Sequence, residues 1–431
     1  MKPLTLSALC LALAAAPAFA QGKPAEPPTT DQKLQELERK VDILSRELEQ
    51  QKTGATFAVA GEQGEHGLGA AASKVYAAAP GLSIGGYGEI LYTAQDSKLQ
   101  DGTRVGSEKS LDALRGVLYV GFKFSDRIVF NSEMEWEHGG FSDEHPEGEA
   151  IMEFAYLDFL IDKRFNVRAG QMLVPMGFIN ELHEPPAFLG AQRPFVEQEG
   201  GIIPTTWHEN GVGVHGDLPG NLSYRIYVMN GLNAEGFSAE GIGGGRQDAN
   251  KANAHSLAWT GRLDWTFMPG ASVGGSFYTG NSNQSGDAES LRTTVADLHA
   301  EWRAYGFQVR GLYARSTNAK GGVEAAFAPT DPQYQVGTKQ WGGYLEVGYD
   351  VLRGRFGKQA LIPYARWERL DTQAEVAAGV VPTGEFDQSV LTGGVSWKPI
   401  PNVAVKADVS RIENHANTGR NQFNLALGYY F

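Results

Sequence analysis

The sequence predicts an all-β fold, a 16-stranded antiparallel transmembrane β-barrel preceded by a short N-terminal coiled-coil helix. Apolar and polar residues alternate along most of the chain after residue 81, as in strands with one lipid-facing and one water-facing side. The connections between these runs alternate between short and long. The composition combines 54 glycines and 10% aromatic residues with 42% hydrophobic residues and a mean hydropathy of −0.30. That composition is too polar for a bundle of membrane helices and too aromatic for a disordered chain.

The first twenty residues, 1–20, are predicted to be a signal peptide. Lys2 supplies a positive charge, an apolar run follows, and Ala18-Phe19-Ala20 matches a cleavage site, so the mature chain would begin at Gln21. The single cysteine, Cys10, lies within this peptide. A disulfide framework or a zinc finger is therefore excluded.

Residues 21–30 are a proline-rich spacer, and residues 31–52 are predicted to form a coiled-coil helix. Apolar residues recur there at alternating spacings of three and four, which is the pattern of a coiled-coil core. The core residues are Leu34, Leu37, Val41, Leu44 and Leu48. Because the pattern lasts under three heptads, a single amphipathic helix lying on another surface is the alternative; we favour a small parallel coiled coil, held together by the attached barrels.

Residues 53–80 are rich in glycine and alanine without a sustained period, which predicts a linker. The barrel is expected over residues 81–431. Its predicted strands lie near 81–93, 113–124, 127–138, 149–161, 164–173, 208–218, 222–231, 256–267, 272–280, 292–304, 306–316, 339–351, 359–370, 387–398, 402–412 and 421–431. Sixteen antiparallel strands with both ends on the short-turn side require alternating short and long connections, as found here.

Aromatic residues on the apolar faces gather beside the short turns, as in the interfacial girdle of outer-membrane barrels. They are Phe124, Trp265, Phe267, Trp302, Tyr349, Trp397 and Phe431. A soluble β-sandwich is the alternative, but it would rarely place tryptophan at strand ends so consistently. A closed barrel also pairs every backbone group that crosses a bilayer.

Two motifs resemble the phosphate-selective porin O and P family. They are Ile84-Gly85-Gly86-Tyr87-Gly88-Glu89 in the first strand, and Arg168-Ala169-Gly170-Gln171 followed by Pro175-Met176-Gly177. The short coiled coil before the barrel is similar to a subgroup of that family. The resemblance implies a trimeric channel in the bacterial outer membrane, with loops folded into the lumen and the coiled coil in the periplasm.

From this resemblance we expect a porin, a passive diffusion channel for small hydrophilic solutes, with phosphate or small carboxylate anions favoured. The expected partners are outer-membrane lipid, lipopolysaccharide, two further copies of the chain and the permeant solutes. A net charge of −13 disfavours nucleic acid. The alternative is a barrel without transport, serving as an envelope tether or an adhesin.

Catalysis and cofactors are not expected. No Gly-x-Ser-x-Gly motif is present. Glu181-Leu182-His183-Glu184 lies among prolines and not on a helix with metal-ligand spacing, so neither a catalytic residue nor a metal ligand is assigned.

The polar strand faces predict which charged residues line the pore. The basic candidates are Arg115, Lys123, Arg168, Arg225, Arg262, Arg303, Arg310 and Arg366. The acidic candidates are Glu133, Glu135, Glu137, Asp297 and Glu301. Alternatively, most of these charged side chains are ordinary hydrated residues of the barrel wall.

The longest connection, residues 174–207, is the candidate constriction. It follows the fifth predicted strand and keeps many apolar residues, which an exterior loop would not need. Its charged residues are Glu181, Glu184, Arg193, Glu197 and Glu199. An acidic loop opposite a basic wall would set up a transverse electric field at the narrowest point. A surface loop that packs against a neighbouring subunit is the alternative.

Overall fold

The computed structural model describes residues 36, 39–40, 64–140, 148–285 and 290–431, and divides the chain into the units Met1–Thr56 and Phe57–Phe431. In the first unit, Glu36, Arg39 and Lys40 are helical, and Lys40 Nζ lies 2.8 Å from the Glu36 carboxylate one turn away. The predicted signal peptide 1–20, the spacer 21–30 and the predicted coiled-coil core lie outside the described residues.

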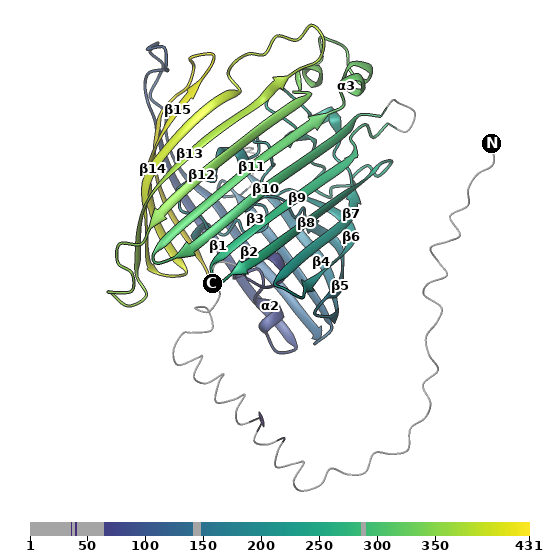
Figure 1. Cartoon of the computed structure of the whole chain (residues 1–431), viewed down its shortest axis with the longest axis vertical. Coiled ribbons are helices and arrows are strands. Elements are labelled where there is room, and N and C mark those ends of the chain that lie inside the picture. Colours follow the sequence, from purple (N-terminus) through teal and green to yellow (C-terminus); the bar gives the residue numbers. More distant parts are fainter. Residues whose placement is uncertain (1–35, 37–38, 41–63, 141–147, 286–289) are drawn as a thin grey trace, which may run out of the picture. The chain divides into compact units, whose positions relative to one another are not determined.

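The second unit contains sixteen antiparallel strands that close into a barrel (Figure 1). The fold class predicted for this part of the chain is therefore confirmed. The strands are β1 (Gly81–Gln95), β2 (Lys109–Ser125), β3 (Ile128–Glu137), β4 (Glu149–Asp162), β5 (Phe165–Leu173), β6 (His208–Leu218), β7 (Leu222–Asn230), β8 (Leu257–Met268), β9 (Ala271–Asn281), β10 (Arg292–Ala304), β11 (Phe307–Asn318), β12 (Lys339–Tyr349), β13 (Ala360–Glu375), β14 (Asp387–Ile400), β15 (Val403–Asn414) and β16 (Gln422–Tyr430).

Each strand pairs with its sequence neighbours, and β1 pairs with β16 to close the barrel, with Ile90 opposite Leu427. The observed bounds differ most from the predicted ones at the start of β2 and the end of β13. There the β1–β2 ladder continues to the Ala94–Lys109 pair and the β12–β13 ladder to the Lys339–Glu375 pair. These extensions are mostly polar, and in β13 even the buried residues Thr372 and Gln373 are polar, so the apolar alternation that marks a strand in the sequence is missing from them.

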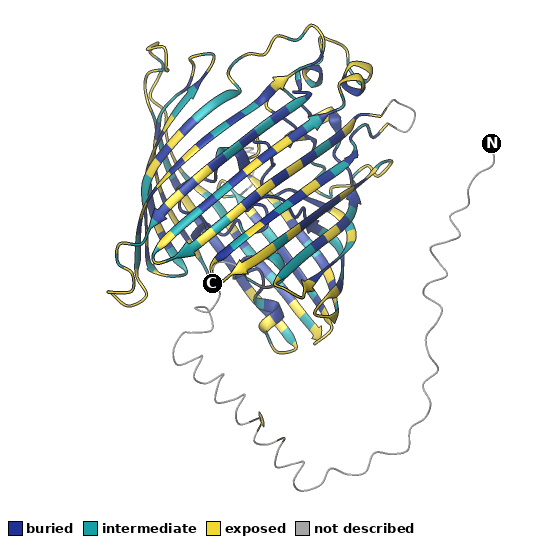
Figure 2. Ribbon diagram, in the orientation of Figure 1, coloured by how far each residue is buried: buried dark blue, intermediate teal, exposed yellow. Residues whose placement is uncertain are grey.

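The outer face of the barrel is apolar, and Figure 2 shows buried and exposed residues alternating along the strands. In β16 the exposed Phe423, Leu425 and Leu427 alternate with the buried Asn424 and Ala426. Large exposed apolar side chains recur on all sixteen strands, which is far more than a water-soluble surface carries. Of the predicted aromatic girdle, all members are exposed except Tyr349, which is half-buried.

The short turns lie at one end of the barrel, where the C terminus and helix α2 (Lys74–Ala77) also lie (Figure 1). Tyr305 and Gly306 form one of the two-residue turns, with φ values of 55° and 89°. Positive φ at both central residues matches the twist of the flanking strands, which explains the glycine.

The packed core lies inside the barrel. It is built from inward side chains of the wall together with short helical turns in the connections, and it includes buried residues such as Tyr87, Phe154, Met176, Ile202 and Trp207. Those turns are η2 (Glu65–Gly67), η3 (Pro185–Ala187), η4 (Phe195–Glu197), η5 (Ala234–Gly236), η6 (Gly243–Gly245), α3 (Lys320–Ala326) and η7 (Pro332–Gln335). Among the described residues, no helix has the length and apolar character to cross a membrane.

Residues 64–80 differ from the linker that the sequence predicted over 53–80. Leu68, Ala72, Val75 and Tyr76 are buried against the inner face of the wall. The Asn131 side chain on β3 donates to the Ala72 carbonyl at 2.8 Å. The small residues that looked like linker composition allow this segment to fit inside the barrel; we call residues 64–78 the mouth segment, because they lie in the short-turn mouth.

Candidate functional site

The connection between β5 and β6, residues 174–207, folds into the lumen, and we call it the inner loop. Its ends are held together by a hydrogen bond from the Val174 amide to the Trp207 carbonyl at 2.9 Å. The apolar residues that the sequence singled out are almost all buried there. The fully buried ones are Met176, Phe178, Ile179, Phe188, Leu189, Ile202 and Ile203.

Inward glycines of the wall leave room for the inner loop. A Cβ on Gly348 would lie 2.6 Å from the Leu189 side chain, and one on Gly428 would lie 2.3 Å from Pro185. Real Cβ atoms do not approach other atoms so closely, so a side chain at either position would force the loop to shift. Part of the glycine excess is thus explained by the close approach of loop and wall.

Glu181 is the acidic loop residue that faces the basic wall. Its carboxylate lies 3.1 Å from Arg225 Nε on β7 and 3.8 Å from Arg262 Nη1 on β8. Asp264 of β8 also binds both arginines, at 2.9 and 2.7 Å. Burial raises the pKa of Glu181, although both arginines lower it. A loop carboxylate and two wall cations therefore meet here, and a wall carboxylate shares the two cations.

The other acidic loop residues have different partners. Glu184 accepts hydrogen bonds from the Ala71 and Ala72 amides at 2.8 and 3.0 Å, and burial raises its pKa to about 7. Glu197 turns back onto its own loop and also accepts the Tyr344 hydroxyl at 2.7 Å. Glu199 is exposed and pairs with Arg246 at 3.1 Å.

Arg193 is buried within the inner loop and donates to the Thr205 hydroxyl at 2.8 Å. The sequence predicted a transverse field from four loop carboxylates, Glu181, Glu184, Glu197 and Glu199. Of these four, only Glu181 faces the basic wall. The remaining loop carboxylates hold the loop and the mouth segment in place.

The predicted basic residues all lie on the inward strand faces, and each has an acidic neighbour. The pairs are Arg115 with Glu89, Glu135 and Glu137; Lys123 with Asp126; Arg168 with Asp158; Arg225 and Arg262 with Asp264 and Glu181; Arg303 and Arg310 with Glu301; and Arg366 with Glu346 and Glu368. These predicted basic residues are thus compensated by ion pairs, which fits the acidic composition.

Cations of four later strands also bind the backbone of the inner loop. Lys398 donates to the Pro186 carbonyl at 2.7 Å and Lys406 to the Gly190 carbonyl at 2.8 Å. Further contacts to loop carbonyls come from Arg310 at 3.4 Å and from Arg366 at 3.4 Å. These side chains position the loop as well as lining the wall.

The predicted acidic residues divide between two sides of the lumen. Glu133 and Glu135 are buried on β3, and Glu137 at the end of that strand is partly exposed. On β10, Asp297 accepts the Gly177 amide of the inner loop at 3.2 Å, and Glu301 binds Arg310 at 2.7 Å. All five have partners within the described lumen.

A cavity of about 1040 Å³ opens at the short-turn end. Glu181, Arg225, Arg262 and Asp264 line its inner part, and His66 of the mouth segment lines its side. The volume suits solutes of the size of small metabolites. The Glu181 cluster therefore lies where a solute in this cavity would meet the inner loop.

The residues predicted to line the pore do not include Glu153. β3 and β4 shift register between the Glu133–Phe154 and Met134–Met152 pairs, so Glu153 is the extra residue of a β-bulge. The bulge turns its side chain into the lumen, where it is fully buried. The sequence did contain a signal for this bulge, because strict alternation along the strand would place the charged Glu153 on the lipid-facing side.

The fold and the inner loop place this protein in the class of sixteen-stranded barrels with the architecture of outer-membrane porins. OmpF of Salmonella typhi has 13% identity and a TM-score of 0.53, covering 81% of this chain and 97% of that one. The anion-selective porin of Comamonas acidovorans has 10% identity and a TM-score of 0.51, covering 81% and 99%. The channel DcaP of Acinetobacter baumannii has 11% identity and a TM-score of 0.51, covering 81% and 97%.

A protein of Aquifex aeolicus (strain VF5), described as uncharacterized, is 37% identical over 375 residues, which are 85% of this chain and 83% of that protein. The chain belongs to the same family as this Aquifex protein. No family model matches the sequence.

Proposed function

We propose that the protein is an outer-membrane porin, a passive diffusion channel for small hydrophilic solutes. The observation that carries the proposal is a closed barrel, apolar outside and charged inside, whose lumen is crossed by an inward-folded loop. Closure satisfies the backbone groups that lipid would leave unpaired, and the outer apolar surface suits contact with lipid and lipopolysaccharide. The similarity in fold to three outer-membrane channels also supports a function as a porin.

Small anions, phosphate or small carboxylates, are the solutes that we propose. Arg225 and Arg262 lie together at the inner part of the short-turn cavity, and guanidinium groups bind carboxylate and phosphate in a bidentate manner. A permeating anion would compete there with Glu181 and Asp264 for the two cations. The resemblance to phosphate-selective porins O and P and the anion selectivity of the Comamonas porin point the same way.

We further propose a homotrimer with the N-terminal helix in the periplasm. Outward Gly343 and Gly393 leave flat patches in the barrel wall, where close packing between barrels is possible. Size measurement in detergent by light scattering tests this, and a monomeric native protein would contradict it.

The decisive test of the channel is conductance of the full mature chain in planar bilayers. We expect stepwise current and, in a salt gradient, a reversal potential of the sign for anions. A reversal potential of the sign for cations would be consistent with a channel, but it would refute anions as the solutes. The second candidate, a tether or adhesin barrel without transport, is favoured by the mouth segment, which narrows the short-turn end, and it predicts no current steps.

A further inference from the structure

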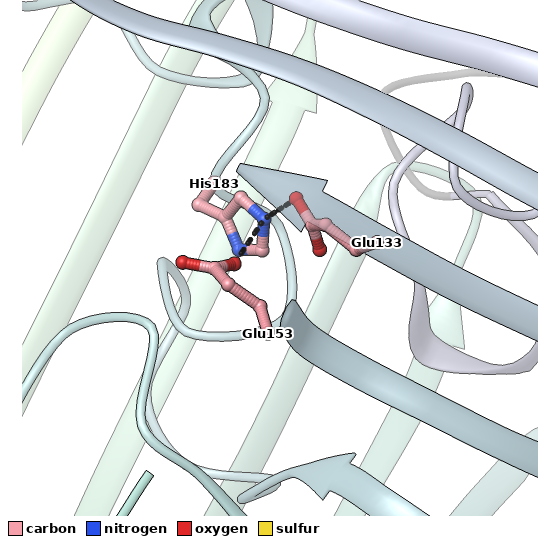
Figure 3. Close-up of side chains that lie close together, drawn as sticks. All are labelled: Glu133, Glu153 and His183. Atoms are coloured by element: carbon pink, nitrogen blue, oxygen red, sulfur yellow. Dashed lines mark hydrogen bonds and ion pairs between the residues drawn. The ribbon is translucent and has the colours of Figure 1, made fainter. Parts of the chain in front are cut away.

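Three buried side chains converge where the inner loop meets the wall formed by β3 and β4. His183 Nε2 lies 3.1 Å from Glu133 Oε1 and 3.5 Å from Glu153 Oε2 (Figure 3). The ligand atoms of the three residues all lie within 4.8 Å of one another, and none of the residues exceeds 2% exposure. Figure 3 shows the imidazole between the two carboxylates.

The β-bulge makes this convergence possible. In regular β4, Glu153 would point outward to lipid, as its neighbour Met152 does. The extra residue turns the carboxylate inward, next to Glu133 on the paired strand. A bulge that re-aims one side chain disrupts the strand ladder locally, and bulges of this kind are frequent at functional sites.

The imidazole is oriented as metal-bound histidines usually are. His183 Nδ1 lies 3.0 Å from the Asn180 carbonyl, which can only accept, so Nδ1 carries a proton. In the neutral ring, Nε2 then presents its lone pair to the carboxylates. Asn180 is itself fixed, because its side chain donates to the Val174 and Trp207 carbonyls at 2.6 and 2.9 Å.

An ion pair with protonated His183 does not account for the whole cluster. One Nε2–H can satisfy Glu133, which lies closer and has suitable geometry. Among the described residues, His183 is the one cationic group within ion-pair distance of Glu153, since Arg115 is occupied with three other carboxylates. Glu135 lies beside Glu153, and the two carboxyl groups can share a hydrogen bond only while one of them holds a proton; with both ionised they repel each other. A buried carboxyl group without a partner is costly, whether charged or neutral.

We propose that Glu133, Glu153 and His183 bind a divalent transition-metal ion, with Zn²⁺ as the probe that represents the class. Two ligand atoms at zinc distances in tetrahedral geometry lie about 3.4 Å apart, close to the 3.1 and 3.5 Å found here. A dication would supply a counter-charge for Glu153. Two carboxylates and one imidazole leave a fourth position for water.

The ion would join the inner loop to the wall, since His183 comes from the loop and the carboxylates come from β3 and β4. The sequence predicted no metal ligand, because Glu181-Leu182-His183-Glu184 lacks helical spacing. The two carboxylates that complete the site with His183 come instead from β3 and β4, earlier in the chain. The site does not depend on the proposed transport function.

Metal analysis of the full mature chain tests the site. The protein is purified in detergent, stripped with a chelator and dialysed against Zn²⁺. We expect one tightly bound Zn²⁺ per chain. A wild-type protein without stoichiometric Zn²⁺ would overturn the proposal and would indicate that a proton shared among the carboxylates stabilises the cluster. X-ray absorption of the Zn²⁺-loaded wild type should show one imidazole and otherwise oxygen ligands; two or more imidazoles, or none, would also overturn it.

Glu153→Gln and His183→Gln should each weaken Zn²⁺ binding at least tenfold. His299→Gln is the matched control, because His299 also lies between two carboxylates but contacts Asp297 and Asp264 through opposite ring nitrogens and cannot chelate one ion with both. It should keep wild-type affinity. Equal Zn²⁺ affinity of folded Glu153→Gln and the wild type would refute the assignment, and if that variant does not fold, the X-ray absorption spectrum of the wild type decides.

Discussion

Glu181 of the inner loop lies 3.1 Å from Arg225 of β7, and both side chains line the cavity at the short-turn end. This ion pair joins loop and wall at a place that a solute can reach. The two residues are far apart in sequence, and each also has a second partner, since Arg262 approaches Glu181 and Asp264 binds Arg225. Selectivity is therefore expected to depend on the balance of these four charges.

Arg225→Glu should shift the reversal potential toward cations. The exchange replaces a positive by a negative charge, and each unit charge contributes about 1 kcal/mol at 4 Å in water, so the ratio of anion to cation permeability should fall several-fold. Planar-bilayer recordings in a salt gradient measure it. Arg168→Glu should act in the same direction.

Arg411→Glu is the matched control for charge. Arg411 is exposed near the end of β15 and pairs with Glu413, away from the inner loop. It should leave the reversal potential unchanged. Equal shifts in the two variants would mean that total charge, and not the Glu181 cluster, sets selectivity.

Gly121→Leu should displace the mouth segment. Gly121 faces inward on β2, and a Cβ there would already lie 2.6 Å from Val75 Cγ2 of helix α2. Since overpacking costs about 1–3 kcal/mol, we expect residues 64–78 to become sensitive to protease and the conductance to rise.

Gly116→Leu on the same strand is the control for Gly121→Leu. Gly116 faces outward, and a Cβ there would meet open space within 4 Å. Conductance and protease resistance should stay at wild-type values. If Gly121→Leu conducts no better than this control, the mouth segment does not limit the current.

The barrel was predictable because lipid on one side imposes period two on every strand. Phe423, Leu425 and Leu427 illustrate this, since each is apolar and each is exposed. The inner loop was also recognisable, because buried residues such as Ile202 and Ile203 have no place in an exterior loop.

The site was less predictable, because its partners are set by loop conformation and by one irregularity in a strand. Glu197 binds amides of its own loop, and Glu184 binds the mouth segment. The acidic character of these residues therefore did not reveal whether their side chains point to the basic wall. Glu153 reaches the lumen only through a bulge, which the alternation of residue types does not reveal.

The fold should become less stable in acid because of His66 in the mouth segment. Burial, together with the charge of Arg168, lowers the pKa of His66 from 6.5 to about 4, and the ring packs against Tyr76 and His215. Between pH 6.5 and 4 the unfolded chain therefore binds more protons at this position, so the free energy of unfolding should fall as the pH drops through that window. The loss is at most about 3 kcal/mol.

His66→Asn removes this titration and keeps the backbone, because φ is 56° at residue 66 and asparagine tolerates that region. Urea unfolding at several pH values measures the difference between variant and wild type. That difference should change between pH 6.5 and 4 and stay constant above pH 7. A difference independent of pH would show that His66 is accessible to protons in the folded state.

Arg366→Ala should destabilise the barrel far more than Arg369→Ala, although both arginines lie on β13. Arg366 is buried and binds Glu346 and Glu368 at 3.2 and 2.7 Å, so its removal leaves two buried carboxylates without a counter-ion. Breaking a buried pair of this kind costs about 3–5 kcal/mol. Arg369 lies on the opposite, outward face of β13 and pairs with Asp387 at the start of β14; both side chains are partly exposed, and such a pair contributes about 1 kcal/mol or less. The difference in urea midpoint between the two variants measures this contrast, and equal losses would mean that water reaches Arg366 and screens its partners.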